Sequence, residues 1–323
     1  MPVGLLTKTS HIDLLLPYHH VVSDEYLPHI NEIYFNKNKK EFIKDLDWIL
    51  KHFNAVHPDQ VADFVLYQKI LPEKSFLLSF DDGYREVCDI IAPILIEKGV
   101  PAIFFINPEF VDNKNLFYRC KLSLILNKIK FDDSLANSVK KYLNHEHGSY
   151  DDLRRAILRI NYRDQYKANE LGKIVEVDFS EFLRKQQPFL TSAQIGKLTT
   201  QGFVFGGHSM DHPHYKFLDP DKQYRQTVES INFIDRFQRS TFHYFAFPHE
   251  DRHVSQEFFT KMKESHLKCL LFGVQNQRPE KANFILHRFN AERPGKNIAG
   301  MAKSILFYNS LLRLVNRQQP VRK

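Results

Sequence analysis

Short apolar runs of strand length alternate along this chain with stretches of helical periodicity, and this alternation is the feature that most restricts its fold. Residues 75–80 form a mostly apolar run, as a buried parallel strand requires. Apolar residues then recur at helical spacing from Val87 to Leu95, and residues 101–106 form a second buried run. Strand, loop, helix and strand in this order make a βα repeat, and such repeats build parallel sheets or barrels.

The same rhythm returns in the second half of the chain. Strands are predicted at residues 203–205, 242–247, 268–272 and 284–287, and helices at 193–198, 222–237 and 255–265. A last helix over about 296–316 is expected to pack on the outside. The charged stretch 112–188 has helical patches without the βα rhythm, so it predicts a mainly helical insertion. The pattern therefore predicts one α/β barrel domain over residues 1–323 that carries this insertion.

Composition and charge exclude several classes of protein. No apolar run approaches the ~20 residues that cross a bilayer. The first ten residues lack the pattern of a secretory signal, so we expect a cytoplasmic protein. The three cysteines are far apart and form no CxxC pair, which argues against a thiolate zinc site. The net charge is +7, but the cations are scattered and no nucleic-acid motif accompanies them, so we expect no nucleic-acid partner.

Two carboxylates follow the predicted strand at residues 75–80. In barrels of parallel strands the active site forms where the strands end. Asp81 and Asp82 stand at such an end, and Gly83 permits a tight turn. Adjacent carboxylates are costly unless they share a cation or a proton. One Asp can then bind a metal ion while the other reaches the water on that ion; the alternative is a helix N-cap.

Two histidines follow the strand at residues 203–205. His208 and His212 lie four residues apart and meet on one side if the segment coils as a helical turn. Imidazole is the commonest ligand of zinc-like ions. Asp82, His208 and His212 together make a set that leaves metal positions open for water and substrate. Such an ion lowers the pKa of bound water towards ~7, and Asp81 can act as general base, as amide hydrolysis requires.

The Asp-Asp-Gly turn and the His-Ser-x-x-His segment resemble the first two motifs of the polysaccharide deacetylases of carbohydrate esterase family four, the NodB-homology domain. The resemblance implies a distorted (β/α)7 barrel. It also implies that Asp81 is the catalytic base and that a divalent ion, usually Zn²⁺, is bound by the three ligands named above. The Tyr-His-His-Val segment at residues 18–21 resembles an opening segment of members that act on surface polysaccharides. Residues 245–248 resemble the third motif, so Phe247 and Pro248 are expected to line the substrate groove.

The chain departs from the family pattern around two catalytic groups. The third motif often begins with an arginine that supports the base, and none stands at the matching place. The late Leu-x-His motif, whose histidine protonates the leaving amine, has its nearest match at residues 285–287. His287 is therefore a candidate general acid, with His249 as a second and His214 as a weaker third. Arg288 is expected to pair with either Glu292 or Asp81, and the Tyr84 backbone amide to help hold the oxyanion.

The sequence thus predicts a metal-dependent hydrolase that removes N-acetyl groups from an amino-sugar-containing polysaccharide or glycan precursor, in cell-surface polysaccharide biosynthesis. The alternatives are a catalytically impaired barrel that only binds sugars, an O-acetyl esterase, and a hydrolase of small linear amides on the same fold. The expected partner is an N-acetylated oligo- or polysaccharide. A lipid-linked precursor would bring peripheral contact with a membrane, which the positive charge would favour.

Overall fold

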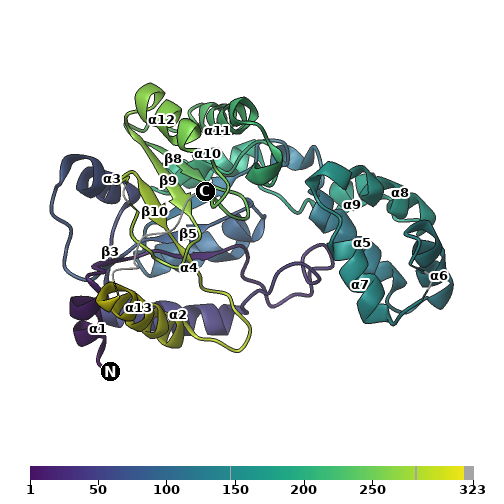
Figure 1. Ribbon diagram of the computed structural model, residues 1–323, viewed down its shortest axis with the longest axis horizontal. Coiled ribbons are helices and arrows are strands. Elements are labelled where there is room, and N and C mark those ends of the chain that lie inside the picture. The colour runs from purple at the N-terminus through teal and green to yellow at the C-terminus, as the bar shows by residue number, and fades with distance from the viewer. Residues whose placement is uncertain (146, 281, 316–323) are drawn as a thin grey trace.

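The computed structural model describes residues 1–145, 147–280 and 282–315, and its larger part is built around a barrel of parallel strands (Figure 1). Eight strands pair in the order β10-β9-β8-β7-β6-β5-β2-β11. Their bounds are β2 (Pro17–His19), β5 (Leu78–Phe80), β6 (Ala102–Ile106), β7 (Val204–Gly207), β8 (His243–Ala246), β9 (Cys269–Gly273), β10 (Ile285–His287) and β11 (Phe289–Asn290). A three-stranded sheet of β1 (Leu14–Leu15), β4 (Ser75–Phe76) and β3 (Asn54–Ala55) extends from it.

The barrel closes through one continuous stretch of chain. β10 pairs with β9 and β11 pairs with β2, and only Arg288 separates β10 from β11. The Arg288 amide donates to the Gly273 carbonyl, and the Phe289 amide donates to the Leu16 carbonyl. Because β10 and β11 share one position, the eight strands occupy seven positions around the barrel. The predicted distorted (β/α)7 barrel is confirmed.

Helices cover the outside of the barrel. They are α1 (Val3–Ser10), α2 (Lys39–His52), α3 (Pro58–Tyr67), the π-helical turn Val87–Ile91 with α4 (Ala92–Glu97), α10 (Ser192–Thr200), α11 (Pro220–Ile234), α12 (Gln256–Ser265) and α13 (Ile298–Leu314). Thr191 is the N-cap of α10, as predicted, and accepts a bond from the Gln194 amide. α13 lies within the predicted range 296–316, of which residue 316 lies outside the described residues.

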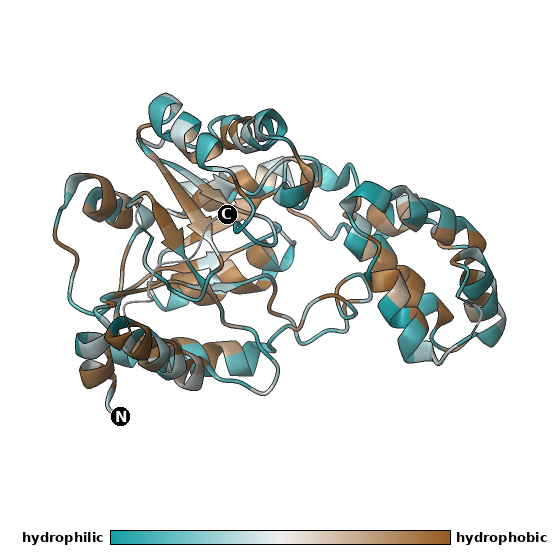
Figure 2. Ribbon diagram, viewed as in Figure 1, coloured by the Kyte–Doolittle hydropathy of each residue, from teal (hydrophilic) through white to brown (hydrophobic). Residues whose placement is uncertain are grey.

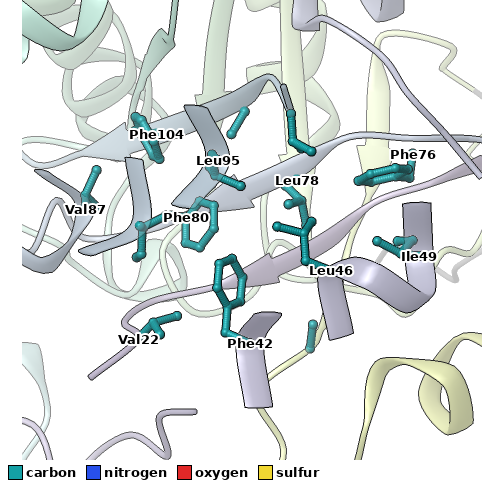
Figure 3. Close-up of a cluster of buried hydrophobic side chains, with 14 of the residues drawn as sticks. Val22, Phe42, Leu46, Ile49, Phe76, Leu78, Phe80, Val87, Leu95 and Phe104 are labelled. Atoms are coloured by element: carbon teal, nitrogen blue, oxygen red, sulfur yellow. The ribbon is translucent and has the colours of Figure 1, made fainter. Parts of the chain in front are cut away.

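Side chains of the strands alternate between two apolar clusters. Ala102, Phe104 and Ile106 of β6 pack with Phe80 and with α2, whereas Ile103 and Phe105 face the other way, into a second cluster. Figure 3 shows the first cluster, where Phe42 of α2 lies beside Phe80 and Leu46 of α2 lies beside Leu78. All of these side chains are buried. This packing fixes the strands whose ends carry the polar residues.

In its described residues, the stretch predicted as an insertion forms five α-helices, and they stand apart from the barrel in Figure 1. They are α5 (Tyr118–Ile129), α6 (Asp133–Tyr142), α7 (Tyr150–Leu158), α8 (Tyr166–Ile174) and α9 (Phe179–Gln186). Their buried apolar residues form a third cluster, which also takes in Tyr84 and Phe189 beside the barrel. The predicted helical character of this stretch agrees with the structure. That the whole chain is a single domain stays a prediction.

Candidate active site

Asp81 and Asp82 form the turn at the end of β5. The Asp81 amide donates to the His19 carbonyl of β2, which continues the strand pairing into the turn. Asp82 and Gly83 both have left-handed backbone conformations, with φ of 70° and 69°. A Cβ on Gly83 would lie 2.8 Å from Ile106 Cγ2, so this position requires glycine for both conformation and space. Neither Asp caps a helix, because the next helical turn begins at Val87 with Glu86 as its N-cap.

Asp82, His208 and His212 meet at the end of the barrel. Asp82 Oδ1 lies 3.5 Å from His208 Nε2 and 3.2 Å from His212 Nε2. One ligand atom from each residue lies within 4.8 Å of the other two, and all three side chains are buried. The predicted trio is therefore brought together from strand ends 126 residues apart in sequence, counted from Asp82 to His208.

The two histidines reach this arrangement through an irregular loop and not through a helical turn. Ser209 and His212 both have positive φ, of 64° and 60°. The Asn107 side chain donates to the carbonyls of His208 and Ser209, and the His212 amide donates to Ser209 Oγ at 3.2 Å. His208 Nδ1 lies 2.8 Å from the Ala246 carbonyl oxygen. In a neutral imidazole, donation from Nδ1 to that carbonyl leaves the unshared electron pair on Nε2, the nitrogen that faces Asp82.

Arg288 binds the predicted catalytic base. Its Nη1 donates to Asp81 Oδ1 at 2.6 Å and its Nη2 to Asp81 Oδ2 at 2.8 Å, and both side chains are buried. Arg288 thus pairs with Asp81, and Glu292 binds His20 instead. Burial raises the pKa of Asp81, but the guanidinium outweighs this effect and lowers the pKa below its ordinary value. Arg288 holds the carboxylate ionised and in a fixed orientation.

His20 is a site residue that sequence reasoning missed. Its amide donates to Glu292 Oε2 at 2.9 Å, and its Nδ1 binds Glu292 Oε1. Burial lowers the pKa of His20, but the carboxylates of Glu292, Asp82 and Asp81 raise it to about 9. His20 therefore carries a proton at neutral pH, with Nε2 left to present it. The Tyr-His-His-Val segment was the available signal, but nothing in it tells which histidine faces the barrel end.

The candidate general acids named from sequence have different surroundings. His249 contacts the predicted ligand His212, with ring centroids 4.5 Å apart, and stacks on His214 at 4.9 Å. Burial and these neighbouring histidines hold the pKa of His249 well below its ordinary value. His287 is buried, with Nε2 3.3 Å from Glu280 Oε2 and Nδ1 3.9 Å from Asp251 Oδ2. Alternation along the strand turns His287 away from the side on which Arg288 reaches Asp81. Its role stays a prediction.

The predicted substrate-binding side chains are largely taken up by packing. Tyr84 is buried, its hydroxyl lies 3.6 Å from Cys120 Sγ, and its ring stacks on Phe189. This leaves the backbone amide as the predicted contribution of Tyr84. Phe247 is buried in an aromatic cluster with Tyr215 and Phe258, and Pro248 is buried beside it. Their predicted contact with substrate stays a prediction.

The insertion and the loop after β2 form part of the wall of the site. Phe117, which precedes α5, contacts His212 with ring centroids 4.5 Å apart. Tyr34 from the loop after β2 stacks on His20 at 4.1 Å. The same loop is held against the insertion, where Arg154 Nε donates to Glu32 Oε2 at 2.6 Å. The sequence pattern predicts none of these contacts, because the segments that they join share no hydrophobic periodicity.

Comparisons with known proteins bear on this geometry. Residues 68–268 match the sequence model of the polysaccharide deacetylase family. This chain belongs to the polysaccharide deacetylase family. The match spans 201 of the 323 residues, and it includes Asp81, Asp82, His208 and His212. The resemblance predicted from the two motifs is confirmed, and the chain is a deacetylase.

Solved structures of deacetylases share the fold. IcaB from Ammonifex degensii is 16% identical, with a TM-score of 0.55 over 90% of this chain and 97% of its own. The deacetylase PplD of Streptococcus pyogenes, in complex with acetate, is 13% identical, with a TM-score of 0.58 over 96% and 99%. A de-N-acetylase from Aggregatibacter actinomycetemcomitans is 16% identical, with a TM-score of 0.53 over 89% and 99%. At these identities the likeness concerns the fold alone. A search of curated proteins found no significant sequence match.

Proposed function

We propose that this polysaccharide deacetylase is a metal-dependent enzyme that removes N-acetyl groups from an amino-sugar-containing polysaccharide or glycan precursor. The observation that carries the proposal is the meeting of Asp82, His208 and His212 beside the Asp81–Arg288 pair. A role in cell-surface polysaccharide biosynthesis is part of the proposal, supported by the resemblance of residues 18–21. A cytoplasmic location stays a prediction.

The three residues fit a divalent metal ion. Three groups that can each offer a ligand atom converge in a buried space, and the buried carboxylate among them requires positive charge or hydrogen-bond donors beside it. Burial raises the pKa of Asp82, but His212 and His208 outweigh it and the pKa lies well below its ordinary value, so the carboxylate is ionised. Two imidazoles and one carboxylate form the ligand set of open catalytic zinc sites, and Zn²⁺ is the ion we propose. When bound, such an ion supplies Lewis acidity towards an amide carbonyl.

The remaining polar groups divide the proton transfers between them. Asp81 would accept a proton from the attacking water, since Arg288 keeps it ionised and aimed at the barrel end. His20 would protonate the departing sugar nitrogen, because it is already protonated at neutral pH and its Nδ1 is fixed by Glu292. Glu292 positions His20 and stabilises its charge. With these two roles assigned, the role proposed for His249, which lies beside His212, is contact with the substrate.

Metal content measured together with acetate release tests the proposal. Asp82→Ala is expected to weaken metal binding by more than about a hundredfold, because even partners outside the ligand set contribute 10–100-fold. Acetate release from N-acetylated oligosaccharides should fall with it. His266→Ala is a control outside the site, since His266 follows α12 and contacts Tyr224, and it should keep both the metal and the activity. Full metal occupancy in the Asp82→Ala protein would contradict the assignment.

A further inference from the structure

The net charge of the chain is concentrated at its two ends. Residues 1–12 contain one cation, Lys8, and no acidic residue. Residues 296–323 contain six cations and no acidic residue: Lys296, Lys303, Arg313, Arg317, Arg322 and Lys323. Together these segments carry seven positive charges, which equals the whole net charge of +7. The other residues, 13–295, are therefore neutral overall, with 38 cations and 38 acidic residues.

The described parts of these two segments lie side by side. α1 and α13 pack against each other at the end of the molecule away from the insertion (Figure 1). Thr9 Oγ1 and Ser310 Oγ are 2.9 Å apart and join the two helices. α13 buries one side against the body of the protein, through Ile298, Met301, Ala302, Leu306 and Asn309. The cations Lys8, Lys303 and Arg313 are exposed on this pair of helices.

The outward side of this helix pair is also apolar. Leu314 is 80% exposed, and Leu5, Phe307, Tyr308 and Leu311 are each 45–48% exposed. A helix that covers a soluble protein normally has polar residues opposite its buried stripe. α13 instead combines large apolar side chains with cations on its exposed side, and Figure 2 shows it as predominantly hydrophobic. We call these exposed residues of α1 and α13 the terminal face.

We propose that the terminal face binds the surface of an anionic lipid bilayer, with α13 lying in the plane of the interface. Helices that lie in this interface combine aromatic and leucine side chains with Lys and Arg, and anionic lipids attract the cations. A second copy of the chain fits less well, because two terminal faces would bring like charges together. Among the described residues, no helix is long and apolar enough to cross a bilayer.

Co-sedimentation with lipid vesicles tests this proposal. The full chain should bind vesicles of phosphatidylcholine with phosphatidylglycerol at low salt, bind phosphatidylcholine alone weakly, and be released from the mixed vesicles by high salt. Removing two cations in Lys303→Gln/Arg313→Gln should lower the affinity roughly tenfold or more. The triple variant Phe307→Ser/Leu311→Ser/Leu314→Ser should also lose binding, because it removes the exposed apolar side chains.

Matched variants elsewhere on the surface separate this face from general charge or hydrophobicity. Lys263→Gln/Lys268→Gln makes the same change of charge near α12, and Ile70→Ser/Phe131→Ser/Leu267→Ser removes other exposed apolar side chains. Both controls should bind vesicles like the unaltered chain, and all variants should release acetate from a soluble substrate at the unaltered rate. Equal loss in controls and terminal-face variants would overturn the proposal. So would a dimer in solution that only the terminal-face variants convert to monomer.

Discussion

The Asp81–Arg288 pair connects residues that are 207 positions apart in the chain, and it replaces an interaction that the third motif lacks. From the sequence, both Asp81 and Glu292 were possible partners of Arg288, because the sequence alone does not show which distant residues lie close together in the fold. The absent motif arginine had favoured a barrel that binds sugars without cleaving them. Because Arg288 reaches the carboxylate from the strand segment that closes the barrel, that reason for expecting an impaired site no longer holds.

Removal of the Asp81 charge should affect turnover and stability separately. Asp81→Asn should keep the metal and lower kcat by about 10²–10⁴-fold, as expected for loss of a general base. It also leaves Arg288 buried without its carboxylate, which should cost about 3–5 kcal/mol of the free energy of unfolding. The double variant Asp81→Asn/Arg288→Met should regain stability in urea unfolding while staying inactive. An Asp81→Asn protein with unchanged kcat would exclude Asp81 as the base.

Three histidines can be compared as general acids by the same substitution. We expect His20→Gln to lower kcat by about 10²–10⁴-fold with KM nearly unchanged, because His20 would act on the leaving nitrogen. His249→Gln should mainly raise KM, and His287→Gln should mainly reduce stability because it lies between Asp251 and Glu280. Steady-state kinetics of the three variants decide the assignment. If His287→Gln alone abolishes kcat, the sequence-based choice is correct and the His20 assignment is wrong.

At the scale of elements, hydrophobic periodicity predicts the longer strands and helices, and it does not predict very short strands or irregular loops. The strands β5 to β10 and the helices α4, α10, α11, α12 and α13 were predicted because apolar residues recur over enough positions. β11 has only two residues, so the closing pair with β2 was not predicted. The three proposed metal ligands and Asp81 follow strand ends and could be named. His20 could not, because it follows His19 directly after a three-residue strand, and so short a strand has too little alternation to show which of the two histidines lies in the site.

The turn after β5 offers a test at this scale. Gly83→Ala and Gly99→Ala both place a Cβ on a residue with positive φ, which should cost about 1–2 kcal/mol in each case. Only at Gly83 would the Cβ also meet Ile106, which should add about 1–3 kcal/mol. Urea unfolding of the two variants isolates the contact with Ile106, since the backbone strain is common to both. Equal losses would mean that the turn has room for a side chain.

At the scale of the whole molecule, the insertion and the barrel act on one site. The loop after β2 docks on the insertion through the Arg154–Glu32 pair and brings Tyr34 over His20. The helical character of residues 112–188 was predictable from composition and spacing. Its contribution to the site was not, because Phe117 reaches His212 only in the folded chain. The sequence likewise does not show that Lys8, Lys303 and Arg313 lie on one pair of helices, because that follows from the packing of α1 on α13.

Two buried histidines should make the molecule sensitive to acid. Burial lowers the pKa of His19 and of His29 to about 3, against about 6.5 in the unfolded chain. The unfolded state therefore binds more protons below pH 6.5, and stability falls as the pH decreases from about 6.5 towards 3. Each histidine should contribute a slope of about 1.4 kcal/mol per pH unit. His29→Phe should lower the slope by one such increment below pH 6 and leave the slope at pH 8 unchanged.

The central claim is that a divalent ion at Asp82, His208 and His212 enables Asp81 to support deacetylation. The most direct measurement is acetate release from an N-acetylated oligosaccharide by the chain stripped of metal, as Zn²⁺ is added back. We predict no release without metal, a rise that saturates near one ion per chain, and no rise for Asp81→Asn at the same metal content. Acetate release by the stripped chain at the full rate, or equal release by Asp81→Asn, would contradict this account.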